Sequence, residues 1–294
     1  MEKINTTVFL DNSTTSKFLL KKILCNKFFK VNCVILSNKK IKNFLKNKKI
    51  DKIFISNLKK KNLPILNFLE KKKQFIGFSY YDYKIPGEIF KKFKKGVVNF
   101  HPSYLPYNKG RHSAFWSIYD NTPMGASSHW INKSFDRGNI FLQKRIILNK
   151  LCTANDVYIN QIKALKSVIN STLNYVSNNK FFSKKQKIVK NSYHYKKDLN
   201  NVCSLDLNSK ISEKKLVRII RGTNFNNNGF FIKDRNFIYK IVSTFKFKKK
   251  KGKKKDTKIF LKKFFIKLHQ NKILKYNLNY YNYLMIIKSK LFKI

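Results

Sequence analysis

The chain has 294 residues, of which 43% are hydrophobic, so it can bury the core of one large domain or of two ordinary ones. Its 65 lysines and arginines against 14 acidic residues give a net charge of +51, which invites a nucleic-acid interpretation. Only six of these basic residues are arginine, the residue best suited to grip phosphate in a fixed geometry. We therefore interpret the charge mainly as the lysine bias of an A/T-rich genome, and a polyanion-binding role stays open.

Cysteine usage and hydropathy exclude several other classes. The four cysteines are scattered and form no CxxC pair, which disfavours zinc ligation, and they indicate no disulfide framework. We expect no metal and a reducing, cytoplasmic location. No run of about 18 apolar residues is present, so no membrane span is expected.

The first residues have the pattern of a parallel α/β unit. A short apolar strand over 7–10 is followed by a polar stretch over 11–16 that can cap a helix, and by a second strand over 31–36. The turn between the first strand and the helix contains no glycine. Nucleotide sites of the NAD, FAD or Walker type need glycine there, so the turn disfavours them.

Further elements follow in order. Strands are predicted over 53–55, 74–79 and 96–101, and a long amphipathic helix begins near Thr153. We expect a linker over 178–190 and a smaller unit from about 191, which includes apolar runs over 229–232 and 237–241. The stretch from Lys246 to Lys258 carries nine lysines and should be solvated. The last residues alternate lysine and asparagine with apolar residues and receive no assignment.

One block, from Asn99 to Asp136, carries candidate chemistry. Four of the five prolines and five of the nine glycines lie between positions 86 and 138, which indicates tightly specified loops. His101 is the natural proton handler, and Asn99 shares its face of an extended strand. An amide donor beside an imidazole suits a carbonyl that becomes an oxyanion. Asp136 can orient the imidazole. Together, these three residues predict acyl or one-carbon transfer to an amine, without a metal or a covalent intermediate.

Each of these residues also has a structural interpretation. A histidine after a strand is often a satisfied structural residue, an asparagine there can cap the next turn, and an Asp-x-Gly sequence can be an ordinary turn. His129 lies in an alternating run, and we interpret it as a strand residue near the site rather than as a base.

The block resembles the formyltransferase family that uses 10-formyltetrahydrofolate. The similar motifs are Asn99-Phe100-His101, His101-Pro102-Ser103-Tyr104-Leu105-Pro106, Lys109-Gly110, Gly125-Ala126-Ser127-Ser128-His129 and Asp136-Arg137-Gly138. The fourth motif departs from the family, which has Val-Thr where this chain has Ala126-Ser127. Weaker similarity runs from about residue 5 to 178, and Tyr83-Lys84-Ile85-Pro86 is similar to the family's folate-side loop.

This resemblance implies an α/β fold: a Rossmann-like formyltransferase domain with a mostly parallel sheet over 1–178. A small C-terminal domain over 191–241 and a lysine-rich tail of unknown fold over 242–294 would follow. The implied catalytic residues are Asn99, His101 and Asp136. The residues implied to bind the folate donor are Tyr83, Ile85, Pro86 and Gly138. The residues implied to bind the acceptor are Ser103, Lys109 and Gly110.

The stretch over 105–118 indicates the acceptor, because it looks most like the sugar-nucleotide members of the family. We therefore expect formyl transfer from 10-formyltetrahydrofolate to a nucleotide-linked amino sugar. Methionyl-tRNA is the alternative acceptor, because the basic C-terminal part would suit tRNA. A non-catalytic, basic nucleic-acid-binding protein is a second alternative. A homodimer is also left open.

Overall fold

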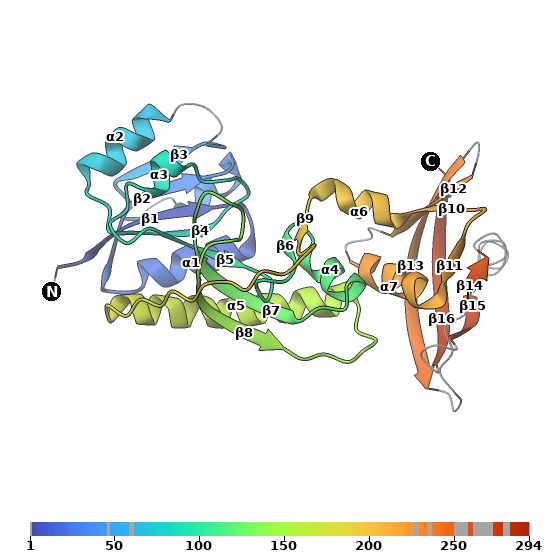
Figure 1. Ribbon diagram of the computed structural model, residues 1–294. Coiled ribbons are helices and arrows are strands. Elements are labelled where there is room, and N and C mark those ends of the chain that lie inside the picture. Colours follow the sequence, from blue (N-terminus) through green and yellow to red (C-terminus); the bar gives the residue numbers. More distant parts are fainter. Residues whose placement is uncertain are drawn as a thin grey trace. The chain divides into compact units, whose positions relative to one another are not determined.

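The computed structural model describes residues 2–45, 48–58, 62–225, 229–234, 237–249, 258–260, 273–278 and 283–293 (Figure 1). The chain forms two compact units. Unit 1 comprises Met1–Lys109, Pro123–Ile146 and Asn160–Ser192, and unit 2 comprises Gly110–Thr122, Ile147–Ile159 and Tyr193–Ile294.

Unit 1 is built on a seven-stranded sheet with the order β3-β2-β1-β4-β5-β7-β8. Its strands are β1 (Ile4–Leu10), β2 (Phe29–Leu36), β3 (Lys52–Ile55), β4 (Ile76–Tyr80), β5 (Val97–His101), β7 (Met124–Trp130) and β8 (Ile140–Ile146). The first five are parallel, whereas β7 runs antiparallel to both β5 and β8. The predicted α/β fold with a mostly parallel sheet is confirmed, and each strand predicted from residue 7 to residue 101 is present.

The helices of unit 1 follow from local sequence signals. Ser13 caps α1 (Thr14–Leu24) by accepting a hydrogen bond from the Ser16 amide, as the polar stretch predicted. Pro64 lies in the first turn of α2 (Leu63–Lys71), where its missing amide hydrogen costs nothing. The short elements are α3 (Gly87–Phe90) and the 3-10 helix η1 (Lys39–Leu45), and the long helix is α5 (Ala154–Ser177).

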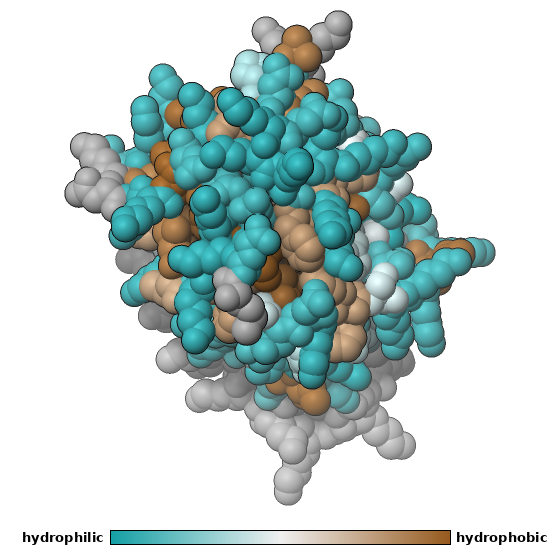
Figure 2. All heavy atoms as spheres, turned by 90° about the vertical axis from the view of Figure 1, so that its left-hand side faces the viewer, coloured by the Kyte–Doolittle hydropathy of each residue, from teal (hydrophilic) through white to brown (hydrophobic). Residues whose placement is uncertain are grey.

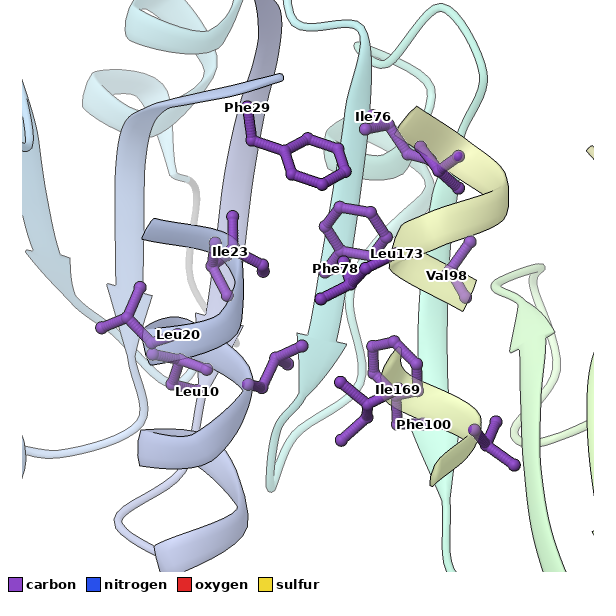
Figure 3. Close-up of a cluster of buried hydrophobic side chains, with 14 of the residues drawn as sticks. Leu10, Leu20, Ile23, Phe29, Ile76, Phe78, Val98, Phe100, Ile169 and Leu173 are labelled. Carbon is purple, nitrogen blue, oxygen red and sulfur yellow. The ribbon is translucent and has the colours of Figure 1, made fainter. Parts of the chain in front are cut away.

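Both faces of the sheet are buried, so its strands are apolar on both sides. Residues such as Leu10, Phe78 and Val98 pack against α1 and α5 on one face (Figure 3). On the other face, Phe9, Ile35 and Val97 pack with residues of α2 and α3. Val97 has even spacing from residues 99 and 101, so Asn99 and His101 belong to this second face.

Among its described residues, unit 2 combines helices with small sheets. The helices are α4 (Ser113–Tyr119), α6 (Lys196–Cys203) and α7 (Glu213–Thr223). A five-stranded sheet has the order β10-β12-β13-β16-β15, formed by β10 (Ser204–Asp206), β12 (Phe230–Asp234), β13 (Phe237–Lys249), β16 (Tyr283–Lys293) and β15 (Ile273–Leu278). The strands β11 (Lys210–Ser212) and β14 (Lys258–Phe260) form a pair. Two-residue strands, β6 (Lys109–Gly110) and β9 (Tyr193–His194), lie where the chain passes between units.

Parts of the predicted tail are therefore ordered strands. Thr244 pairs with Lys288 in the antiparallel ladder of β13 and β16, which runs from Tyr239 to Lys249. The strands β15 and β16 lie among the last residues, which received no assignment from the sequence. Residues 250–257, which hold several of the nine lysines, lie outside the described residues.

An aromatic stack anchors α4 within unit 2. The rings of Trp116 and His194 are stacked with centroids 3.8 Å apart, and His194 Nε2 lies 3.0 Å from a carboxylate oxygen of Asp120. A Cβ at Gly222 of α7 would come within 2.6 Å of the Phe115 ring, so this glycine permits α4 and α7 to pack closely.

The surface and the cysteines add few further features. The face of the protein shown in Figure 2, on the side of α2, is covered mostly by hydrophilic side chains. None of the helices among the described residues has the length and apolar character needed to cross a bilayer. The described part of the chain also holds no group of three or more histidine, cysteine or acidic side chains that suits a metal. All four cysteines are free thiols, and burial raises the pKa of Cys203 to about 12.

Candidate active site

Strands β5 and β7 bring three polar side chains to one face of the sheet. Asn99 and His101 are two residues apart on β5 and therefore lie on the same face. The antiparallel register places His129 of β7 directly opposite Asn99. The Asn99 Nδ2 atom lies 3.1 Å from His129 Nε2. The cross-strand register therefore makes His129 a neighbour of Asn99.

Asp136 joins the two histidines. One of its carboxylate oxygens lies 3.4 Å from His129 Nε2, and the other lies 3.8 Å from His101 Nε2. The side chains of His101 and Asp136 are each 10% exposed, and that of His129 is 3% exposed. The structure thus gathers the predicted residues Asn99, His101 and Asp136 around His129. We call these four residues the His-Asp cluster.

Hydrogen-bond partners indicate where protons lie on the two rings. His129 Nδ1 is 3.0 Å from the Trp130 carbonyl oxygen, which can only accept, so Nδ1 carries a proton. In the neutral ring the single lone pair of Nε2 then accepts from the Asn99 amide. His101 Nε2 is 3.3 Å from the Asn108 carbonyl, and it carries a proton for the same reason.

The backbone around Asp136 is unusual. Asp136 has a φ of +51°, in the left-handed region that few residues other than glycine, asparagine and aspartate adopt readily. A Cβ at Gly138 would lie 1.7 Å from the Trp130 carbonyl oxygen, so only glycine fits there. The Asp-x-Gly sequence is therefore a tight turn that presses against β7 and carries a carboxylate into the His-Asp cluster.

The loop after β5 is fixed by three side-chain hydrogen bonds. Ser127 Oγ donates to the Ser103 carbonyl at 2.7 Å and accepts from the Leu105 amide at 3.0 Å. Gln143 Nε2 donates to the Leu105 carbonyl at 2.6 Å. These bonds join the His-Pro-Ser-x-Leu-Pro motif to β7 and β8, and they explain why serine and glutamine occur on those strands. The Leu105–Pro106 peptide bond is cis.

The three residues predicted to bind the acceptor have different environments. Ser103 is fully buried. Lys109 is 5% exposed, and its ammonium group donates to Ser192 Oγ at 2.9 Å. Burial and the nearby charge of Arg137 lower the pKa of Lys109, while Asp136 opposes that shift. Gly110 belongs to unit 2 and has a φ of +85°. The binding role of all three stays a prediction.

A cavity of about 690 Å³ opens in unit 1 beside the loop predicted to bind folate. Its lining is largely apolar and aromatic, with charged groups among it. The lining residues are Asn57, Leu58, Asp82, Tyr83, Lys84, Pro86, Gly87, Lys133 and Phe135. Tyr83 and Pro86 therefore line the cavity, whereas Ile85 is buried in the core beside it. Phe135, the neighbour of Asp136, connects the cavity with the His-Asp cluster along the chain.

Comparisons with known proteins identify similar sequences and folds. A family profile described as Formyl transferase matches residues 8–171, more than half of the chain. A GDP-perosamine N-formyltransferase of Brucella melitensis is 40% identical over 84 residues, which are 28% of this chain and 32% of that protein. The chain thus spans about a third of the length of this curated relative.

Solved structures share the fold. A 4-N formyltransferase from Francisella tularensis has a TM-score of 0.67 at 23% identity, covering 79% of this chain and 93% of its own. An N-formyltransferase from Helicobacter canadensis, solved with folinic acid and dTDP-3-aminofucose, has a TM-score of 0.69 at 20% identity. That alignment covers 98% of this chain and 100% of the other, so the architecture extends over both units.

Proposed function

The chain belongs to the formyl transferase family, and we propose that it transfers a formyl group from 10-formyltetrahydrofolate to the amino group of a nucleotide-linked amino sugar. The observation that carries this proposal is the His-Asp cluster. A carboxylate within 4 Å of two histidines, with a carboxamide beside them, provides both oxyanion donors and a proton acceptor.

The cavity fits the formyl donor. Tyr83, Pro86 and Phe135 offer apolar surface for a flat pterin ring and its benzoyl extension, and a volume of about 690 Å³ lies in the range of small-molecule sites. Gly138 follows Asp136 and lets the turn approach β7 closely. In this proposal Ile85 supports the cavity from the core. When bound, 10-formyltetrahydrofolate supplies a formyl carbon as the electrophile.

The residues of the cluster would then act in turn. The acceptor amine forms a bond to the formyl carbon, and the carbonyl oxygen becomes negatively charged. The Asn99 amide and protonated His101 donate hydrogen bonds to that oxygen. Asp136 takes the proton that the amine loses, and its contact with His129 gives that proton a second partner. The bond from the formyl carbon to the donor nitrogen breaks, and that nitrogen gains a proton. The cluster needs no covalent enzyme intermediate for this sequence.

The choice of acceptor rests on sequence and on named relatives. The stretch over 105–118 is similar to sugar-nucleotide members of the family. The Brucella relative is named for GDP-perosamine, and the Helicobacter structure contains a dTDP-amino sugar. We propose a nucleoside-diphosphate amino sugar for the same reason, with Ser103, Lys109 and Gly110 as candidate contacts. The cytosol, where four free cysteines persist, is the proposed location.

A screen of acceptors tests the proposal. The purified protein is incubated with 10-formyltetrahydrofolate and with GDP-, dTDP- and UDP-linked amino sugars, or with methionyl-tRNA, and products are identified by mass spectrometry. We expect formylation of at least one sugar, absence of the product with His101→Ala, and a rate that changes little with salt. Formylation of methionyl-tRNA alone, with a steep fall in rate as salt rises, would contradict the proposed acceptor. No transfer to any acceptor would contradict enzymatic activity.

A further inference from the structure

The segment after α5, predicted as a linker over 178–190, runs along the turn that carries Asp136. The Trp130 indole nitrogen donates to the Phe182 carbonyl at 2.8 Å, and Asn139 Nδ2 donates to Ser183 Oγ at 2.9 Å. Ile140 and Lys184 exchange two backbone hydrogen bonds at 2.8 and 2.9 Å. These contacts hold the segment beside β7, β8 and the turn between them, all within unit 1.

Gln186 makes the most directed contact of this segment. Its Nε2 atom donates to the Asp136 carbonyl at 2.8 Å and to the Gly138 carbonyl at 2.7 Å. Both partners can only accept, so the amide orientation is fixed with its NH₂ group toward the turn. The Gln186 Oε1 atom is buried and has no hydrogen-bond partner among the described residues. All hydrogen bonding by the Gln186 side chain is thus directed at the turn around Arg137.

The turn needs such support. The left-handed conformation of Asp136 is less favourable than an ordinary one and persists only where the surroundings impose it. A rotation of this backbone would swing the carboxylate away from His101 and His129, which lie 3.8 and 3.4 Å from it. The two bonds from Gln186 hold the carbonyl groups of Asp136 and Gly138, on either side of Arg137. Because these carbonyls would have to move if the backbone rotated, the bonds oppose that rotation.

We propose that Gln186 is a positioning residue that fixes the Asp136 turn and thereby holds the Asp136 carboxylate close to His101 and His129. The inference rests on the proposed function for its kinetic consequences, because Asp136 takes a proton in that reaction. Its structural part, the restraint of the turn, stands on the two hydrogen bonds and can be measured without turnover.

Two substitutions of similar shape separate hydrogen bonding from packing. Gln186→Met keeps the length of the side chain and removes both donors. Gln186→Glu places an acceptor against two carbonyls, which raises the pKa of the new carboxyl, and protonation restores one donor. We expect kcat to fall roughly tenfold to hundredfold in both variants at neutral pH, with KM for each substrate within about twofold. As the pH falls, the ratio of kcat to that of the parent should rise for Gln186→Glu and stay constant for Gln186→Met.

A matched control breaks another contact of the same segment. Ser183→Ala removes the hydrogen bond from Asn139 and leaves both Gln186 bonds in place. Its kcat should remain within about twofold of the parent value. An equal loss in Ser183→Ala and the Gln186 variants would mean that packing of the segment alone matters. Turnover near the parent value in both Gln186 variants, with parallel pH profiles, would also overturn the proposal.

Hydrogen exchange distinguishes failure of this inference from failure of the proposed function. Exchange over residues 133–141 is followed by mass spectrometry in the parent, Gln186→Met and Ser183→Ala proteins. We expect exchange to accelerate roughly tenfold in Gln186→Met and little in Ser183→Ala. If the parent transfers no formyl group yet exchange responds in this way, the proposed function fails and the restraint of the turn stands. Unchanged exchange in Gln186→Met would overturn the restraint itself.

Discussion

Two groups of polar side chains in unit 1 are held in different ways. At the carboxyl ends of β1 and β2, serine hydroxyls form hydrogen bonds with carboxylates. Ser16 Oγ donates to Asp11 at 2.6 Å, and Ser37 Oγ donates to Asp82 at 3.0 Å. In the His-Asp cluster, the separations between the histidine nitrogens and Asp136 are 3.4 and 3.8 Å. The contacts of the first group have ordinary hydrogen-bond lengths, whereas those between Asp136 and the two histidines are longer.

The two groups are expected to have different roles, the first in stability and the second in the reaction. Hydrogen bonds of ordinary length around Asp11 fix the start of α1 and the turn after β1, so they contribute to stability. Longer contacts between ionisable groups contribute less to stability, and a substrate can shorten them in the reacting complex. Substitutions in the first group should therefore change stability, and substitutions in the second should change turnover.

The largest effect is expected for the two oxyanion donors. His101→Ala and Asn99→Ala should each lower kcat roughly a hundredfold or more, because each loses a group that stabilises the developing charge. Thermal unfolding should stay close to that of the parent protein. Steady-state formylation and a melting curve on the same samples measure the two quantities. Near-parental turnover at unchanged stability would remove both residues from the chemistry.

A smaller loss is expected for His129, the residue that the cluster adds to the predicted set. His129→Leu keeps a similar apolar volume but removes the contacts with Asn99 and Asp136, so kcat should fall roughly tenfold. Ser128→Ala is the control on the same strand, because Ser128 faces the opposite way and contacts Thr172 at 2.9 Å. It should alter stability and leave kcat within about twofold. The contrast breaks down if the control loses as much turnover as His129→Leu.

The first group should behave in the opposite way. Ser16 is fully buried, and the single proton of its hydroxyl is shared between Asp11 Oδ1 at 2.6 Å and the Tyr80 carbonyl oxygen at 3.1 Å. Ser16→Ala should lower the free energy of unfolding by about 1 kcal/mol, measured by urea titration, because the partly buried hydrogen bond between the hydroxyl and Asp11 is lost. Formylation by the folded variant should remain within about twofold. A large drop in kcat without loss of stability would show that this group takes part in the reaction.

The smallest effect concerns Lys109. Its pKa is lowered from 10.5 in the folded protein, chiefly by burial, so the folded state binds fewer protons than the unfolded state below that pH. Stability of the parent relative to Lys109→Gln should therefore rise as the pH increases toward 10.5. Chemical unfolding of both proteins across this range measures the difference. If the stability of the parent relative to Lys109→Gln instead falls as the pH rises, the pKa of Lys109 is not lowered in the folded protein.

The sequence alone predicts most of unit 1 and only part of the site. Strand and helix positions follow from local periodicity, and family membership confirms the resemblance carried by Asn99, His101 and Asp136. The contact of His129 with Asn99 was not predicted, because it depends on the antiparallel register of β5 and β7. Gln186 lies 50 residues from Asp136, and no local pattern distinguishes its segment from a linker. Contacts between distant segments with irregular backbone leave no periodic signal in the sequence.

The C-terminal strands show a related difficulty. Their alternation of lysine and apolar residues is typical of strands, yet it does not determine which strand pairs with which. In the structure β13 pairs with β16, which is separated from it by more than thirty residues. Nothing in the composition of the lysine-rich stretch distinguishes an ordered strand from a solvated tail.

The chain has two tryptophans, and each belongs to a different unit. Trp116 is stacked on the His194 imidazole in unit 2, whereas Trp130 of unit 1 donates through its indole nitrogen to the Phe182 carbonyl. In Trp116→Phe and Trp130→Phe proteins the remaining fluorophore would report on one unit alone. The protein thus contains its own spectroscopic probes for asking whether its two units unfold together.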